Sequence, residues 1–480
     1  MELFNDLVIP VGSSHLTLIR LMLYISSAFL FSYTGLLFGS VWLSTLAQSK
    51  AKKNNDVAYQ KLAQDLINVG TGIPGMWFGL GLVPMLSFIL SYPQLLSGTE
   101  ADVVGYLFIA LFLLLMGIAA SYGYKSAVNF KSVFYSFKTN VKSTSAGVID
   151  DYHNLDEEVE NNGSFAAIWS VIFLIVATWF IAGATTYAYD SSLWGASIFD
   201  MVFSMNTSMK AILILVMGTA LASAIYMFLT FSWQDGAKNI DEYTKNQYLT
   251  FARKHGLYAA LIIPIVFALQ LVTIPSGALS GWMFVFGLLS LLFVLFFAQS
   301  VYVTKKREHV KGIKFGFMFI LIAFAMFAAQ DQQAFHIAVS GNLHAIAEVA
   351  EEEEAARLAL YESEDNKPQV DAQAIYDTRC IACHKFDAKG VGPAYNDVVT
   401  KYEGKEAELV KFILNPYPVN PSEYPAGMPA QGLTPAEGKA MANWLLGKVL
   451  GGGDSEEKPE GDAPAEEQPA AEEEATASAE

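Results

Sequence analysis

The chain has 480 residues, of which 53% are hydrophobic and 16% charged, and its formal net charge is −17. The apolar residues come in long blocks instead of alternating faces, which excludes an ordinary soluble protein of this length and indicates a membrane protein with a soluble appendage. The negative charge argues against binding of nucleic acid and against docking on anionic lipid headgroups, although much of the acid lies after residue 345.

The chain begins with a segment that does not look like a cleaved signal peptide. Residues 1–14 carry Glu2 and Asp6 but no Lys or Arg, so they lack the basic region of such a peptide. About eight apolar segments follow, each long enough to cross a hydrocarbon core about 30 Å thick. They are predicted at residues 16–46, 73–97, 102–124, 164–189, 209–233, 256–275, 280–303 and 313–335. The fold class expected for residues 1–335 is therefore all-α, a polytopic membrane helix bundle.

The connections between these segments alternate in charge. Lys and Arg gather after the first, third, fifth and seventh segments, beginning with Lys50, Lys125, Lys238 and Lys305, while the loops after the second, fourth and sixth have none. The positive-inside rule places the basic loops in the cytoplasm. The N-terminus is then outside, and eight crossings bring the chain back to the outside at about residue 335.

Two charged residues stand out because they are expected near the outer ends of their helices. They are Arg20 in the first segment and Lys210 in the fifth. An ionisable residue inside a membrane is a functional candidate, but we expect the simpler case, in which both side chains snorkel to the surface. None of the seven histidines is expected at mid-membrane, which argues against histidine-ligated haem in the bundle.

The order of motifs in residues 15–235 resembles the large subunit of bd-type quinol oxidases. Arg20-Leu21 opens the first helix, Phe29-Leu30-Phe31 lies inside it, a long basic loop leads to a Gly-rich second helix, and Ala177-Thr178-Trp179 lies in the fourth. The chain departs from that family at its haem ligands. Ala28 or Leu30 stands about where the family has its first-helix histidine, and the fifth helix has no histidine. The resemblance implies a relative without those haems and without the oxygen chemistry.

An acidic linker is expected at residues 336–370. Ala345 to Leu360 is predicted to be a helix and carries the run Glu351 to Glu354. A solvated spacer is the default interpretation, and a docking surface for a positively charged partner is the alternative.

The only two cysteines of the chain lie in Cys380-Ile381-Ala382-Cys383-His384. A C-x-x-C-H run is typical of covalent haem attachment, because two thiols about one helical turn apart reach the two vinyl groups and the adjoining imidazole becomes an axial iron ligand. A zinc site would need four donors, and the chain has no other cysteine to supply them. A redox pair of thiols is the other alternative.

The residues after this motif resemble small class I bacterial cytochromes c over about residues 370–450. The motifs are Val391-Gly392-Pro393, a helical stretch from Glu406 to Leu414, Ala426-Gly427-Met428-Pro429, and Leu433-Thr434-Pro435 leading into a helix with Trp444. The resemblance implies one haem c attached to Cys380 and Cys383, with His384 and Met428 as axial ligands to the metal and the Pro393 carbonyl orienting His384. A thioether ligand raises the reduction potential and leaves no open site, so the domain is expected to carry electrons and not to catalyse.

The domain boundaries expected from these patterns are 1–335 for the membrane bundle, 336–370 for the linker, 371–450 for the cytochrome c domain and 451–480 for a tail. The tail is rich in Ala, Pro and Glu and is expected to stay disordered, because it cannot bury a core. Haem is attached to c-type cytochromes outside the cytoplasmic membrane, which agrees with the loop charges and predicts a bacterial inner-membrane protein with a periplasmic haem domain.

The predicted function is that of a membrane-anchored c-type cytochrome, which transfers single electrons in the periplasm between components of a respiratory or photosynthetic chain. Its partners would be redox proteins or a membrane respiratory complex. The alternative is a subunit of a quinol-oxidising or bd-oxidase-like complex with its own haem c, which would bind a quinone near the outer helix ends where Arg20 and Lys210 lie. An assembly subunit with an incidental haem is a third hypothesis.

Overall fold

The computed structural model describes residues 13–54, 56–140, 146–233, 240–304, 313–362, 370–419 and 428–451, and all regular elements in these ranges are helices. The chain divides into two compact units between Arg357 and Leu358, here called the membrane unit and the C-terminal unit. The prediction of an all-α protein is confirmed.

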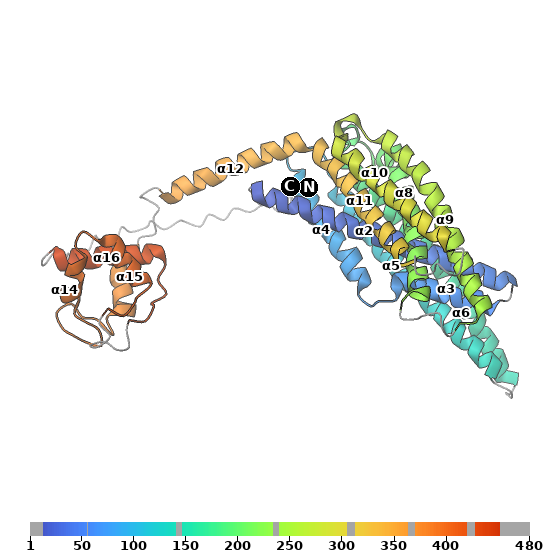
Figure 1. The fold of residues 1–480 in the computed structure, drawn as a ribbon, viewed down its shortest axis with the longest axis horizontal. Helices are drawn as coiled ribbons and strands as arrows, with labels where there is room; N and C mark the ends of the chain where they lie inside the picture. Colours follow the sequence, from blue (N-terminus) through green and yellow to red (C-terminus); the bar gives the residue numbers. More distant parts are fainter. Residues whose placement is uncertain are drawn as a thin grey trace, which may run out of the picture. The chain divides into compact units, whose positions relative to one another are not determined.

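Eight helices in the described part of the membrane unit are long and apolar enough to cross a membrane, as predicted. They are α2 (Ser13–Asn54), η1 (Phe78–Leu82) continuing into α4 (Val83–Leu95), α5 (Val104–Asn140), α6 (Ala146–Tyr187), α8 (Met205–Phe231), α9 (Glu242–Thr273), α10 (Gly281–Val303) and α11 (Ile313–Ala338). Within the bundle α2 packs against α8, α5 against α6, and α10 against α11 (Figure 1).

Several of these helices continue beyond their apolar blocks. The first was predicted to end at residue 46 but runs on to Asn54, and α6 begins at Ala146, well before its apolar block. Lys, Glu and Ala have high helix propensity, so a helix need not end where the hydrophobic residues end. Glu160 of α6 forms ion pairs with Lys52 of α2 and Lys131 of α5, which tie these extensions together.

The basic loop predicted after the first span contains a further helix, α3 (Val57–Thr71). Asp56 caps it by accepting a hydrogen bond from the backbone N–H of Ala58 at 2.9 Å. Leu62, Leu66 and Ile67 of this helix are fully buried, a spacing of about one turn that marks an amphipathic helix. The prediction of a loop was wrong here because the lysines that precede this helix, together with Lys61 within it, obscured the buried stripe.

The predicted linker helix is present as α12 (Ser340–Glu362). Its first turn belongs to the membrane unit, because the side-chain amide of Asn342 donates to the carbonyl oxygens of Leu95 and Ser97 at 3.2 and 3.1 Å. Leu343 joins the hydrophobic core of the bundle. The tail predicted after residue 451 lies outside the described residues.

The C-terminal unit consists of short helices around a small aromatic core. Its elements are α13 (Ala372–Ile375), η6 (Tyr376–Cys380), α14 (Tyr395–Val398), η7 (Val399–Tyr402), α15 (Glu406–Leu414) and α16 (Pro435–Leu450). Tyr376 packs against Trp444, with ring centroids 5.3 Å apart, and Leu409 and Leu445 are buried in the same cluster. The predicted helices from Glu406 and around Trp444 correspond to α15 and α16.

Candidate functional site

The Cys380–His384 motif lies at the end of a helix. Helix η6 ends at Cys380, whose carbonyl oxygen accepts hydrogen bonds from the backbone N–H groups of Cys383 and His384 at 3.1 and 2.9 Å. This tight turn brings Cys380 and His384 to the wall of one cavity, and Cys383 to the wall of a second cavity that shares both residues with the first.

The imidazole ring of His384 is held from two sides. Its Nδ1 donates a hydrogen bond to the carbonyl oxygen of Pro393 at 2.9 Å, and its ring stacks on Tyr395 with centroids 4.9 Å apart. A carbonyl oxygen can only accept, so Nδ1 carries the proton and Nε2 keeps its lone pair. That tautomer is the one that can ligate a metal through Nε2.

Gly392 allows the chain to pass directly against this ring. Its N–H donates to the carbonyl oxygen of Cys383 at 2.8 Å, and a Cβ on Gly392 would lie 2.3 Å from Cε1 of His384. A side chain at this position would displace the imidazole. The backbone of Gly392 and Pro393 therefore forms a cradle that fits a histidine ring in one orientation.

The larger cavity has a volume of about 350 Å³ and the smaller one about 90 Å³. The larger volume is in the range of small-molecule and cofactor sites. The lining residues common to both cavities are Cys380, His384, Pro393, Met428 and Gln431. The wall of the larger cavity is mostly apolar and includes Val399, Leu409, Phe412, Ile413, Leu433 and Leu445. Thiol, imidazole and thioether groups around an apolar cavity fit a covalently attached haem.

Two methionines line the larger cavity. Met428 also lines the smaller one, next to Cys383, whereas Met441 of α16 is 1% exposed and belongs to the hydrophobic core. The position of Met428, at both cavities with His384, favours it over Met441 as a second axial ligand.

The Cys380 thiol does not have the environment of a reactive redox thiol. Burial raises the pKa of the Cys380 thiol and outweighs the hydrogen bond with Tyr395 and the charge of Arg379, which lower it. Redox-active thiols need a lowered pKa, because the thiolate is the reactive form. Among the residues that the structure describes, no three His, Cys, Asp or Glu side chains lie together as metal donors, so the zinc alternative gains no further ligand there.

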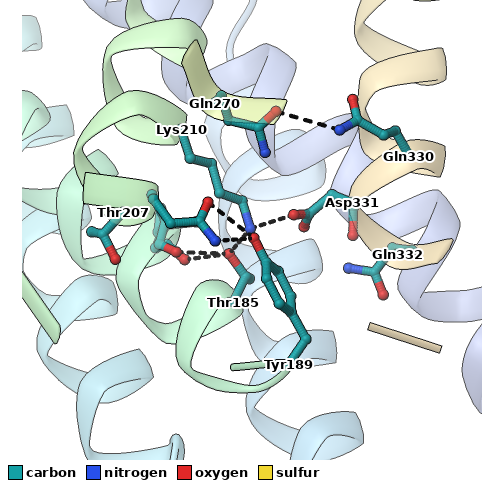
Figure 2. Close-up of polar contacts among 12 residues, drawn as sticks. Thr185, Tyr189, Thr207, Lys210, Gln270, Gln330, Asp331 and Gln332 are labelled. Carbon is teal, nitrogen blue, oxygen red and sulfur yellow. Dashed lines mark hydrogen bonds and ion pairs between the residues drawn. The ribbon is translucent and has the colours of Figure 1, made fainter. Parts of the chain in front are cut away.

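A second polar site lies in the membrane unit (Figure 2). Lys210 of α8 forms an ion pair with Asp331 of α11, and the two residues are 0% and 3% exposed. The prediction that Lys210 snorkels to the surface is therefore wrong. Asp331 was not predicted as a site residue, although it lies in the polar run Gln330-Asp331-Gln332-Gln333 near the end of the last span. Four consecutive polar residues in a largely apolar span are the feature from which this site could have been predicted.

Arg20, the other predicted candidate, is only partly buried and lies on α2, one turn before Tyr24. The Tyr24 hydroxyl donates to Oε1 of Gln333 on α11 at 3.0 Å. Arg20 therefore lies near the α2–α11 contact and does not join the Lys210–Asp331 pair.

Comparison with known proteins concerns the C-terminal unit. Residues 369–447 match the cytochrome c family model. The chain is 41% identical over 69 residues to cytochrome c-552 of Hydrogenobacter thermophilus, covering 69% of that protein and 14% of this chain. It is 38% identical over 69 residues to cytochrome c-551 of Pseudomonas denitrificans, covering 83% of it and 14% of this chain. It is also 36% identical over 80 residues to cytochrome c-551 of Pseudomonas aeruginosa, covering 75% of it and 16% of this chain.

The matches to cytochromes c and the residues that line the cavity both point to haem c. A cytochrome c domain implies covalent haem c, and Cys380 and Cys383 have the required spacing. The domain follows a multi-pass membrane region, so a role in electron transfer is implied. Through its class I cytochrome c domain, the chain belongs to the cytochrome c family.

Proposed function

We propose that this chain is a membrane-anchored electron carrier, with haem c attached to Cys380 and Cys383 and with His384 and Met428 as axial ligands. The observation that carries the proposal is the His384 ring, held by the Pro393 carbonyl at 2.9 Å beside cavities that both cysteines and Met428 line. When bound, haem supplies a reversible one-electron couple.

The residues around the site give this couple its properties. The hydrogen bond from His384 to Pro393 fixes the ring and increases the basicity of the nitrogen that faces the cavity. Met428 would fill the sixth position, so no position would remain for a substrate. The apolar wall would shield a bound haem from water, which would disfavour the more charged oxidation state and raise the reduction potential. These features suit a carrier better than a catalyst.

The membrane unit would hold this carrier at the outer face of the bacterial inner membrane. Two arguments support that side: the alternating charge of the loops, and the attachment of haem to c-type cytochromes outside the cytoplasmic membrane. A membrane anchor confines the carrier to a plane, close to a respiratory complex or to smaller redox proteins. The partners that we propose are such proteins of a respiratory or photosynthetic chain.

The test is the cofactor content and reactivity of the purified full-length chain. We expect the dithionite-reduced spectrum to show haem c alone, at one haem per chain, with no b or d bands. Quinol alone should not reduce the haem at a useful rate, because a single one-electron acceptor would leave a semiquinone stranded; a partner complex should restore reduction. A b-type band, or rapid reduction by quinol alone, would contradict the carrier proposal.

One observation favours the second candidate, a quinol-oxidising subunit. Nε of Arg20 and Nδ1 of His336 are both buried and have no hydrogen-bond partner within the described ranges. Buried polar atoms normally find partners, so these two could bind the oxygens of a quinol headgroup. If this candidate is correct, quinol reduces the haem of the isolated chain, and Arg20→Ala or His336→Ala abolishes the reaction. Failure of both substitutions to slow it would exclude this site.

A further inference from the structure

The membrane unit contains a pair of opposite charges that the proposed electron transfer does not use. Lys210 lies in the second turn of α8, and Asp331 lies two turns before the end of α11. Both helices are membrane spans, and the two side chains are almost completely shielded from solvent. Charged residues at such positions are rare and typically mark ion or proton pathways.

The ammonium group of Lys210 is well surrounded. Besides its ion pair with Asp331, Nζ donates a hydrogen bond to Oγ1 of Thr185 at 2.6 Å. It also lies 5.2 Å from the ring centroid of Tyr189 and 5.8 Å from that of Phe31, in the range of cation–π interactions. The positive charge is thus compensated from several sides and held in place.

The carboxylate of Asp331 is not compensated in the same way. Apart from its ion pair with Lys210, neither of its oxygens accepts a hydrogen bond from the part of the chain that the structure describes. An ionised carboxylate can accept about four hydrogen bonds, and a buried polar atom without a partner is costly. Oε1 of the adjacent Gln330 also lacks a donor there, although its amide group donates to Gln270 at 3.3 Å. The site therefore has more hydrogen-bond acceptors than donors. Protonation of Asp331, or a bound water molecule, would provide a donor.

A purely structural pair is the alternative. Replacing a buried ion pair by apolar residues of similar volume is often neutral or stabilising, because removing two charges from water costs as much as their attraction returns. Holding α8 and α11 together would not require charges, since both helices bury large apolar faces. The incomplete hydrogen bonding of Asp331 also argues against a role in stability alone.

Along α11, polar residues lead from Asp331 towards one end of the helix only. Gln332 donates to the hydroxyl of Tyr92 at 3.1 Å, Gln333 accepts from Tyr24, and His336 follows one turn later with a buried, unpartnered Nδ1. In the other direction, residues 315–329 of α11 are all apolar or glycine. Asp331 is therefore linked by polar groups to the end of α11 and not to its start.

We propose that Asp331 is a proton-exchange group, which takes up a proton from water at the end of the bundle where α11 ends and returns it there, with Lys210 as its fixed counter-charge. In the uptake step, an O–H bond forms at an Asp331 oxygen and the proton leaves a hydronium ion, so no electrons move and the pair changes from neutral to a net charge of +1. Among the described residues, the titratable groups that act on the pair are Tyr92 and Tyr189. Arg20 and His336 lie further towards the end of α11 and act on each other. This proposal does not depend on the haem.

The test is infrared difference spectroscopy of the full-length protein in lipid bilayers, between neutral and acidic pH. We expect one protonated-carboxyl band to grow on acidification, to shift in D2O within the time of the buffer change, and to shift when aspartate is isotope-labelled. The band should be lost in Asp331→Asn and kept in the control Asp65→Asn. Asp65 of α3 pairs with Lys61, but both side chains are partly exposed.

A second variant keeps the proposal falsifiable if Asp331→Asn does not fold. Lys210→Met removes the counter-charge, so Asp331 should stay protonated over the whole pH range and the band should no longer depend on pH. A band in the unmodified protein that does not respond to aspartate labelling, or one that resists exchange in D2O for hours, would overturn the proposal. Either result would identify a sealed structural pair.

Discussion

Gly218 of α8 lies directly against the backbone of Gly35 of α2. A Cβ on Gly218 would lie 2.1 Å from the carbonyl carbon of Gly35, and one on Gly39 would lie 2.5 Å from the carbonyl oxygen of Gly218. Close backbone approach at small residues is a common way for membrane helices to associate, because lipid provides no hydrophobic force between them. The α2–α8 contact is therefore the tightest helix crossing that these glycines define.

Gly218→Ala should destabilise the membrane unit. The added methyl group cannot be accommodated without moving a helix, and overpacking of this kind costs about 1–3 kcal/mol. The measurement is the thermal unfolding midpoint in detergent. Gly105→Ala on α5 is the matched control, since nothing lies within 4 Å of its Cβ position, and this variant should be as stable as the unmodified protein. Equal unfolding midpoints for both variants would show that α2 and α8 do not approach each other as closely as the structure indicates.

Met428→Ala should leave the haem attached but change its ligation. Loss of the thioether is expected to abolish the weak near-infrared sulfur-to-iron band and to lower the reduction potential. The absorption spectrum and a redox titration check this. Met441→Ala is the control: the band should remain, while stability falls by about 2–5 kcal/mol because a core side chain is removed. If the band survives in Met428→Ala and disappears in Met441→Ala, the ligand is Met441.

Gly392→Ala should disturb the orientation of His384. Its new methyl group would meet the imidazole ring, so we expect a lower yield of correctly ligated haem and a shifted reduction potential. Gly447→Ala provides the comparison, because Gly447 lies in α16 with nothing within 4 Å, and its replacement should leave both properties unchanged. An unaltered potential in Gly392→Ala would mean that the ring does not depend on this cradle.

The first turn of α16 should give the C-terminal unit a pH-dependent stability. Hydrogen bonds from the backbone N–H and hydroxyl of Thr434 lower the pKa of Glu437. A carboxyl with a lowered pKa in the folded state contributes stability above its usual pKa of about 4.3, and loses it as the pH falls further. Unfolding in urea can be monitored by haem absorbance. Below that pH, the free energy of unfolding should fall more steeply in the unmodified protein than in Glu437→Gln. Thr434→Ala, which removes the helix cap, should cost about 1 kcal/mol.

Reporter fusions can test the proposed orientation. Fusions after Lys53, Lys142, Lys245 and Lys306 should report the cytoplasm, and fusions after Ser97, Leu193 and Asn366 should report the periplasm. One loop with the opposite result would refute this topology, and with it the loop-charge argument for a periplasmic haem.

The eight spans could be predicted because hydropathy is a local property of about twenty successive residues. The haem motif could be predicted equally well, since Cys380, Cys383 and His384 are neighbours in the sequence. The Lys210–Asp331 pair was not, because its partners belong to different helices and only packing brings them together. The last span was predicted to end at residue 335, only four residues after Asp331, and packing of α11 against α2 and α8 is what buries this residue.

The hydrogen bonds from Asn342 to the end of α4 and the turn after it show that α12 begins as part of the membrane bundle, in one polypeptide with the haem domain. A cell therefore makes the carrier and its anchor in equal numbers and cannot adjust one without the other. Diffusible cytochromes can be supplied in excess over the complexes that they serve. In the function proposed above, the flow of electrons would rise with the amount of the whole chain or with faster encounter with each partner, and dilution would not separate the haem domain from its anchor.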